Sequence, residues 1–134
     1  MSHTILVADD ETDTLDLLEI TLGRAGYRVL RALNGREALD LARSERPDLV
    51  LLDIMMPQLS GLDVLAALRA DGTPPPVIVF SARGRADDLA AGIEAGAVQY
   101  LVKPTSRDRL LEAVRVALAE TAPADDAVNT APKP

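Results

Sequence analysis

Chemically active side chains follow directly after four of the short apolar runs in this 134-residue sequence. They are two carboxylates after the first run, one after the third, a hydroxyl after the fourth and an amine after the fifth: Asp9, Asp10, Asp53, Ser81 and Lys103. Crowded carboxylates repel one another, and their proton affinity rises unless a cation lies between them. Mg²⁺ suits such a site because it prefers a nearly octahedral shell of carboxylate, water and phosphoryl oxygens. The residues therefore indicate a magnesium site with a lysine and a hydroxyl beside it.

The apolar runs predict the strands that must position these side chains. They cover residues 4–8, 28–32, 49–52, 77–80 and 100–102, and stretches with helical spacing separate them. This alternation predicts a doubly wound α/β domain, in which a parallel sheet has helices on both faces. The carboxyl ends of parallel strands share one edge, and ligands bind where the winding reverses. With the strand order 2-1-3-4-5, Asp10 would lie beside Asp53.

Each of these polar residues also has a simpler interpretation when it is taken singly. A strand-end aspartate such as Asp9 or Asp53 commonly caps a helix. A lone serine is unremarkable at such a position, and a lone lysine is usually a solvated surface charge. The binding-site hypothesis is favoured because four strands end on the same edge with groups of the required charge.

Helix signals are uneven along the chain. Asn34 with Glu37, and Ser60 with Asp63, predict capped helix starts. The fourth helix, expected over residues 86–96, contains small residues and an internal glycine, Gly92. Glycine inside a helix costs about 1 kcal/mol relative to alanine, so this helix is predicted to shift most easily.

Composition excludes several classes of site. There is no cysteine and only one histidine, His3, so disulfides, thiol chemistry and a zinc site are not expected. The net charge of −7 argues against direct binding of nucleic acid. No apolar stretch is long enough for a membrane span or signal peptide, so a cytoplasmic protein is expected. Residues 1–120 are predicted to form one domain, and residues 121–134 a disordered tail or linker.

Four segments resemble, in order and spacing, the receiver domain of bacterial two-component response regulators. They are "ILVADDE", "LVLLDIMMPQLSGLD", "VIVFSA" and "YLVKP", and the resemblance covers residues 4–120. It implies a flavodoxin-like (βα)5 fold, a five-stranded parallel sheet of order 2-1-3-4-5. It also implies a signalling domain rather than an enzyme, one that catalyses its own phosphorylation and dephosphorylation.

The resemblance also implies a role for each residue of the proposed site. Asp53 would be the phosphoacceptor, taking its phosphoryl group from a sensor histidine kinase or a histidine phosphotransfer protein. The Mg²⁺ ligands would be Asp9, Asp10, Asp53 and the carbonyl of Met55. Ser81 and Lys103 would contact the phosphoryl group, and the Lys103–Pro104 bond would be cis. Tyr100 would be the switch aromatic, turning inward when Ser81 moves toward the phosphoryl group.

The sequence departs from the commonest family pattern at three places. Ser81 stands where threonine is more frequent, which keeps the hydroxyl and loses a methyl. Arg83 occupies a position that influences phosphoryl lifetime in the family. Val98, Gln99 and Thr105 replace the acidic pair and phenylalanine of regulators with a winged-helix output. Both a monomer and a phosphorylation-dependent dimer therefore stay open.

The expected output is a downstream protein effector, reached through the face of the fourth helix, fifth strand and fifth helix. A stand-alone regulator or phosphorelay shuttle is favoured, and the alternative is the receiver half of a longer regulator. Other functions fit less well. A dehydrogenase would need a glycine-rich turn after the first strand, and an aspartyl phosphatase two aspartates separated by one residue at the nucleophile. A phosphorylation-independent adaptor would be favoured only by an eroded acidic site, and this one is complete.

Overall fold

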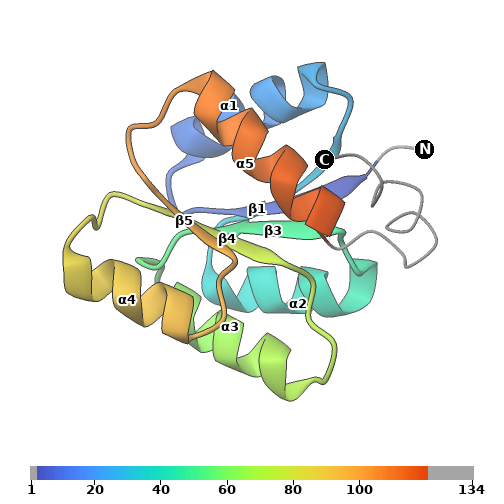
Figure 1. Cartoon of the computed structure of the whole chain (residues 1–134). Coiled ribbons are helices and arrows are strands. Elements are labelled where there is room, and N and C mark those ends of the chain that lie inside the picture. The colour runs from blue at the N-terminus through green and yellow to red at the C-terminus, as the bar shows by residue number, and fades with distance from the viewer. Residues whose placement is uncertain (1–2, 121–134) are drawn as a thin grey trace, which may run out of the picture.

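The computed structural model describes residues 3–120, which form a parallel sheet between two layers of helices (Figure 1). The sheet has five strands in the order β2-β1-β3-β4-β5, as predicted. The strands are β1 (Thr4–Ala8), β2 (Arg28–Ala32), β3 (Leu49–Leu52), β4 (Val77–Ser81) and β5 (Gln99–Val102). The helices are α1 (Thr12–Arg24), α2 (Gly35–Glu45), α3 (Gly61–Ala70), α4 (Ala86–Glu94) and α5 (Arg107–Glu120).

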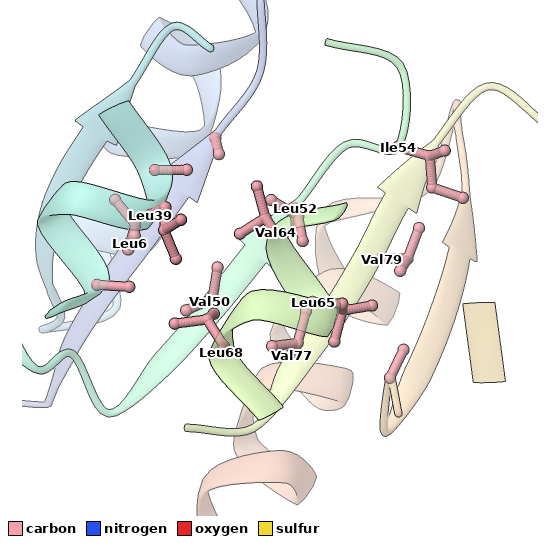
Figure 2. Packing of buried hydrophobic residues seen from close by; sticks show 14 of the residues in the cluster. Leu6, Leu39, Val50, Leu52, Ile54, Val64, Leu65, Leu68, Val77 and Val79 are labelled. Carbon is pink, nitrogen blue, oxygen red and sulfur yellow. The ribbon is translucent and has the colours of Figure 1, made fainter. Parts of the chain in front are cut away.

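Both faces of the sheet are covered, which explains why its central strands are apolar throughout. Helices α1 and α5 lie on one face, and α2, α3 and α4 on the other (Figure 1). Successive strand residues point to opposite faces. In β3, Leu49 and Leu51 therefore join the core under α1 and α5, whereas Val50 and Leu52 pack toward α2 and α3 (Figure 2). All four side chains are buried.

The predicted helix caps are confirmed at α2 and α3. The Asn34 side chain accepts a hydrogen bond from the Glu37 amide at 2.9 Å, and the Glu37 carboxylate accepts one from the Leu33 amide at 2.7 Å. Ser60 and Asp63 form a reciprocal capping box at the start of α3. These caps satisfy amides that no helical carbonyl can reach, so both helices begin at a defined residue.

Helix α4 ends at Glu94, two residues before the predicted boundary, because the chain turns at Gly96 with φ +117°. Arg69 of α3 donates a hydrogen bond to the carbonyl of Ala95 at 2.9 Å. A β-carbon at Gly96 would lie 2.8 Å from Cδ of Arg69 and would push this side chain aside, and the positive φ also favours glycine here. The end of α4 is thereby tied to α3.

Two predictions concern regions at the margins of the fold. The disordered tail or linker predicted for residues 121–134 lies outside the described residues. Within residues 3–120, every helix is too short or too polar to cross a bilayer.

Candidate functional site

The carboxyl edge of the sheet holds the polar residues that follow its strands. The amide of Asp53 donates to the carbonyl of Ala8 at 3.0 Å, and the amide of Lys103 donates to the carbonyl of Ser81 at 2.8 Å. The sheet's hydrogen bonding therefore continues one residue beyond β3 and β5. These backbone hydrogen bonds fix the positions of the Asp53 and Lys103 Cα atoms relative to the sheet.

Three carboxylates converge at this edge, as predicted. One oxygen from each of Asp9, Asp10 and Asp53 lies within 4.8 Å of the others. Asp9 is 1% exposed and Asp53 6% exposed, whereas Asp10 is open to solvent. An all-oxygen donor set of this charge fits a hard dication such as Mg²⁺. The backbone amide of Met55 donates to Asp53 at 3.0 Å, and the role of its carbonyl as a ligand stays a prediction.

Lys103 lies among these carboxylates. Its Nζ is 2.5 Å from Oδ2 of Asp9 and 3.2 Å from Oδ2 of Asp53. The same ammonium lies 5.3 Å from the centre of the Phe80 ring, which is within range of a cation–π interaction. The lysine therefore supplies a positive charge that offsets part of the repulsion between the two aspartates.

Burial and charge shift the pKa values of this pair. Burial raises the pKa of Asp9, and the hydrogen bond from Lys103 only partly opposes this effect. Burial alone would lower the pKa of Lys103, but its hydrogen bonds and charge interactions with Asp9 and Asp53 outweigh burial and raise it. Burial therefore dominates at Asp9, with a small addition from the Asp53 charge, whereas at Lys103 the interactions with two opposite charges dominate. Negative charge at this edge is only partly compensated, which favours a bound cation.

Gly61 keeps the segment after Asp53 close to the start of α3, a role that the sequence analysis missed. Its amide donates to the carbonyl of Ile54 at 2.8 Å. A β-carbon at Gly61 would lie 2.3 Å from the carbonyl oxygen of Asp53, so any other residue would force the two segments apart. The signal that could have found it is a glycine directly after the capping residue Ser60.

Ser81 and Tyr100 are joined through the backbone of Arg83. The Arg83 amide donates to Oγ of Ser81 at 3.2 Å, and the Arg83 carbonyl accepts from the Tyr100 hydroxyl at 2.6 Å. Ser81 is fully buried and Tyr100 is 8% exposed, with its pKa raised by burial. Tyr100 thus already lies inward, in the position that the sequence analysis associated with phosphorylation. The sequence drew attention to the Arg83 side chain, but its peptide groups make these contacts.

A groove between α1 and α5 opens beside the acidic cluster. Its volume is about 660 Å³, and Phe80 and Lys103 form part of its wall. Leu17 and Ile20 of α1 also line it, and they are 65% and 53% exposed. Residues three apart in a helix are neighbours, and a contiguous exposed apolar patch is typical of a surface that contacts another protein.

The sequence and the fold are both similar to those of known proteins. A family model described as the response regulator receiver domain matches residues 5–115. The response regulator MprA of Mycolicibacterium vanbaalenii is 45% identical over 131 residues, which is 98% of this chain and 57% of the relative. The chain thus spans little more than half of that relative's length.

Solved structures give the same result. The receiver domain of the Francisella response regulator 1452 superposes with a TM-score of 0.86 at 31% identity, covering 90% of this chain and 100% of that one. A chain from the CheX–CheY complex of Borrelia burgdorferi with BeF3 and Mg²⁺ superposes with a TM-score of 0.81 at 27% identity. That match covers 85% of this chain and 87% of the other.

Proposed function

Because the chain belongs to the response regulator receiver domain family, we propose that Asp53 accepts a phosphoryl group from a phosphohistidine of a partner protein. The observation that carries this proposal is the convergence of Asp9, Asp10 and Asp53 with Lys103 at one edge of the sheet. A carboxylate oxygen of Asp53 attacks phosphorus, and the bond from phosphorus to the imidazole nitrogen breaks. The nitrogen keeps the electron pair, and Asp53 becomes an acyl phosphate.

The remaining residues position the group and balance its charge, which is most of what phosphoryl transfer requires. Asp9, Asp10, Asp53 and the carbonyl of Met55 would hold Mg²⁺, which when bound neutralises charge on the phosphoryl oxygens. Lys103 supplies a second positive charge from the side of β5. The Ser81 hydroxyl donates a hydrogen bond to the phosphoryl group after its present hydrogen bond from the Arg83 amide breaks.

The groove between α1 and α5 suits the phosphodonor, a sensor histidine kinase or a histidine phosphotransfer protein. The donor must bring a histidine to Asp53, and Lys103 belongs to both the groove and the acidic cluster. The exposed Leu17 and Ile20 would pack against the donor's apolar surface. Docking there places the donor beside the nucleophile and leaves the α4 side of the molecule free.

The face formed by α4, β5 and α5 is the proposed surface for a downstream protein effector in the cytoplasm. Val98 and Ile93 are exposed on this side. The Borrelia structure named above contains a CheX–CheY complex with BeF3 and Mg²⁺, which supports binding of a protein partner by this fold. Direct binding of nucleic acid is not proposed, because the net charge is −7.

A second candidate function is the receiver half of a longer regulator. It is supported by the curated relative, of which this chain spans 57%. In that case the α4–β5–α5 face would contact an effector domain of the same protein. The chemistry at Asp53 is the same in both candidates.

Phosphorylation measured by intact mass tests the central proposal. The protein is incubated with acetyl phosphate or phosphoramidate and Mg²⁺, and we expect the mass to rise by one phosphoryl group. Asp53→Asn should abolish this gain, and a chelator should suppress it in the parent. Asp40→Asn, on the exposed surface of α2, is the matched control and should be labelled normally. Labelling that persists in Asp53→Asn would contradict the assignment.

A further inference from the structure

Helix α4 meets the sheet through a glycine. Gly92 is the only buried residue of this helix. Glycine lowers helix stability, so its presence at the packed position needs a reason. A β-carbon at Gly92 would lie 2.8 Å from Cδ2 and 3.0 Å from Cε2 of Tyr100. The Tyr100 ring therefore occupies the space that any other side chain at position 92 would need.

Other contacts hold the ring beside position 92. Val79 pairs with Tyr100 in the sheet and is fully buried, and its Cγ2 would lie 3.7 Å from the same added β-carbon. The Tyr100 hydroxyl is held by the Arg83 carbonyl at 2.6 Å. A methyl group at position 92 would thus be accommodated by displacing the ring outward or by lifting α4.

We propose that Gly92 is a positioning residue for Tyr100, and that the notch it leaves in α4 sets the balance between the inward and outward positions of the ring. This inference rests on the proposed function for its regulatory consequence. The Arg83 peptide joins the Tyr100 hydroxyl to Ser81. A side chain at position 92 therefore disfavours the inward ring, which is linked through Arg83 to Ser81. A phosphoryl analogue that requires the inward ring then binds more weakly.

Another glycine provides a matched control. Gly23 lies in the last turn of α1, and a β-carbon there would meet nothing within 4 Å. Gly23→Ala should raise the folding equilibrium constant by up to about fivefold through helix propensity alone. Gly92→Ala has the same gain in helix propensity, but its methyl group collides with Tyr100. We therefore expect Gly92→Ala to lower the folding equilibrium constant.

The position of the ring is measured first, and without any phosphoryl analogue. The chain has two tyrosines and no tryptophan, so Tyr27→Phe leaves Tyr100 as the sole reporter. In this background, nuclear Overhauser contacts between the Tyr100 ring and residue 92, together with acrylamide quenching of its fluorescence, report whether the ring is inward. We expect Gly92→Ala to lose the contacts and to be quenched several-fold more strongly, and Gly23→Ala to match the parent. A ring that keeps its place in Gly92→Ala overturns the proposal.

A double-mutant cycle covers the case in which Gly92→Ala folds poorly. Tyr100→Ala empties the space beside position 92. In that background Gly92→Ala should stabilise the fold, by up to about fivefold in the folding equilibrium constant. Destabilisation of similar size in both backgrounds would contradict the proposal that Gly92 makes room for the Tyr100 ring.

Beryllofluoride with Mg²⁺ is the probe for the regulatory consequence. We expect Gly92→Ala to bind it roughly tenfold more weakly than the parent, and Gly23→Ala to bind it equally well. Unchanged affinity in Gly92→Ala with a displaced ring would overturn the regulatory part of the proposal. If the parent itself does not bind beryllofluoride, the proposed function fails and the regulatory part fails with it. In that case the measurement of the ring position still tests whether Gly92 positions Tyr100.

Discussion

Helices α3 and α4 lie on the same face of the sheet, and each follows a strand that leads into the site, but they are attached very differently. Helix α3 begins with the Ser60–Asp63 capping box and buries Val64, Leu65 and Leu68 against the sheet (Figure 2). Helix α4 begins at Ala86, the preceding Arg85 provides no side-chain cap, and Gly92 is its only buried residue. The helix after Asp53 is firmly held, and the helix after Ser81 is lightly held. Elements with few buried apolar contacts open at lower free energy, so α4 is the part suited to move.

The largest expected difference between these helices is in core substitutions. Leu65→Ala should lower the free energy of unfolding by about 2–5 kcal/mol, because the side chain is 1% exposed and its removal leaves a cavity. Leu89→Ala in α4 should cost about 1 kcal/mol, because that side chain is only half-buried. Urea unfolding of both variants checks the comparison. Equal losses would show that α4 is anchored as firmly as α3.

A smaller difference is expected at the helix starts. Ser60→Ala removes the cap of α3 and should cost about 1 kcal/mol. Arg85→Ser offers α4 a cap that it lacks, with Asp88 three residues later as the partner in a capping box, and should add about 0.5–1 kcal/mol. Thermal unfolding measures both changes. Hydrogen exchange in α4 should slow in Arg85→Ser, and unchanged exchange would mean that the missing cap is not what loosens this helix.

The smallest expected effect is a pH dependence at the acidic cluster beside these two helices. The pKa of Asp9 is raised in the folded state, so its contribution to stability is complete at acidic pH and is lost as pH rises through the folded pKa. The free energy of unfolding of the parent should therefore fall, relative to Asp9→Asn, as pH rises above the ordinary carboxyl pKa of about 4. Mg²⁺ should reduce this difference.

Melting temperatures of the two proteins across this pH range, with and without Mg²⁺, provide the measurement. Exposed groups such as Asp71 and Glu112 have lowered pKa values and stabilise in the opposite direction, but they are common to both proteins and cancel. Parallel curves for parent and variant would contradict the raised pKa of Asp9.

Most of the fold could be predicted from the sequence because its strands are buried on both faces. The run Leu49–Leu52 is continuously apolar, and such runs between amphipathic stretches leave few alternatives to a parallel sheet. The charged part of the candidate site followed from the same reasoning, because strand ends in a parallel sheet share an edge. Asp9, Asp53 and Lys103 are therefore where the sequence analysis expected them.

The contacts that control spacing could not be predicted in this way. Gly61 and Gly92 matter because of backbone and ring atoms that approach them from other elements, and such contacts leave no periodic pattern. Gly92 was interpreted as a local weakness of α4, whereas in the structure it makes room for Tyr100. The inward position of Tyr100 and its bond to the Arg83 carbonyl likewise depend on tertiary packing rather than on local sequence.

The hydrogen bond from Arg69 to the carbonyl of Ala95 holds one end of α4 and leaves the other end free to tilt. The nine residues of this helix span about 13 Å at 1.5 Å per residue. Because the Ala95 end is held and the Arg85 end has no side-chain cap, the helix would rotate about the guanidinium of Arg69. A tilt of about 10° then carries the first turn through about 2 Å, while the last turn hardly moves. The end that is free to move is the one that follows Ser81, so a change beside the site would displace the first turn of α4 and leave its last turn in place.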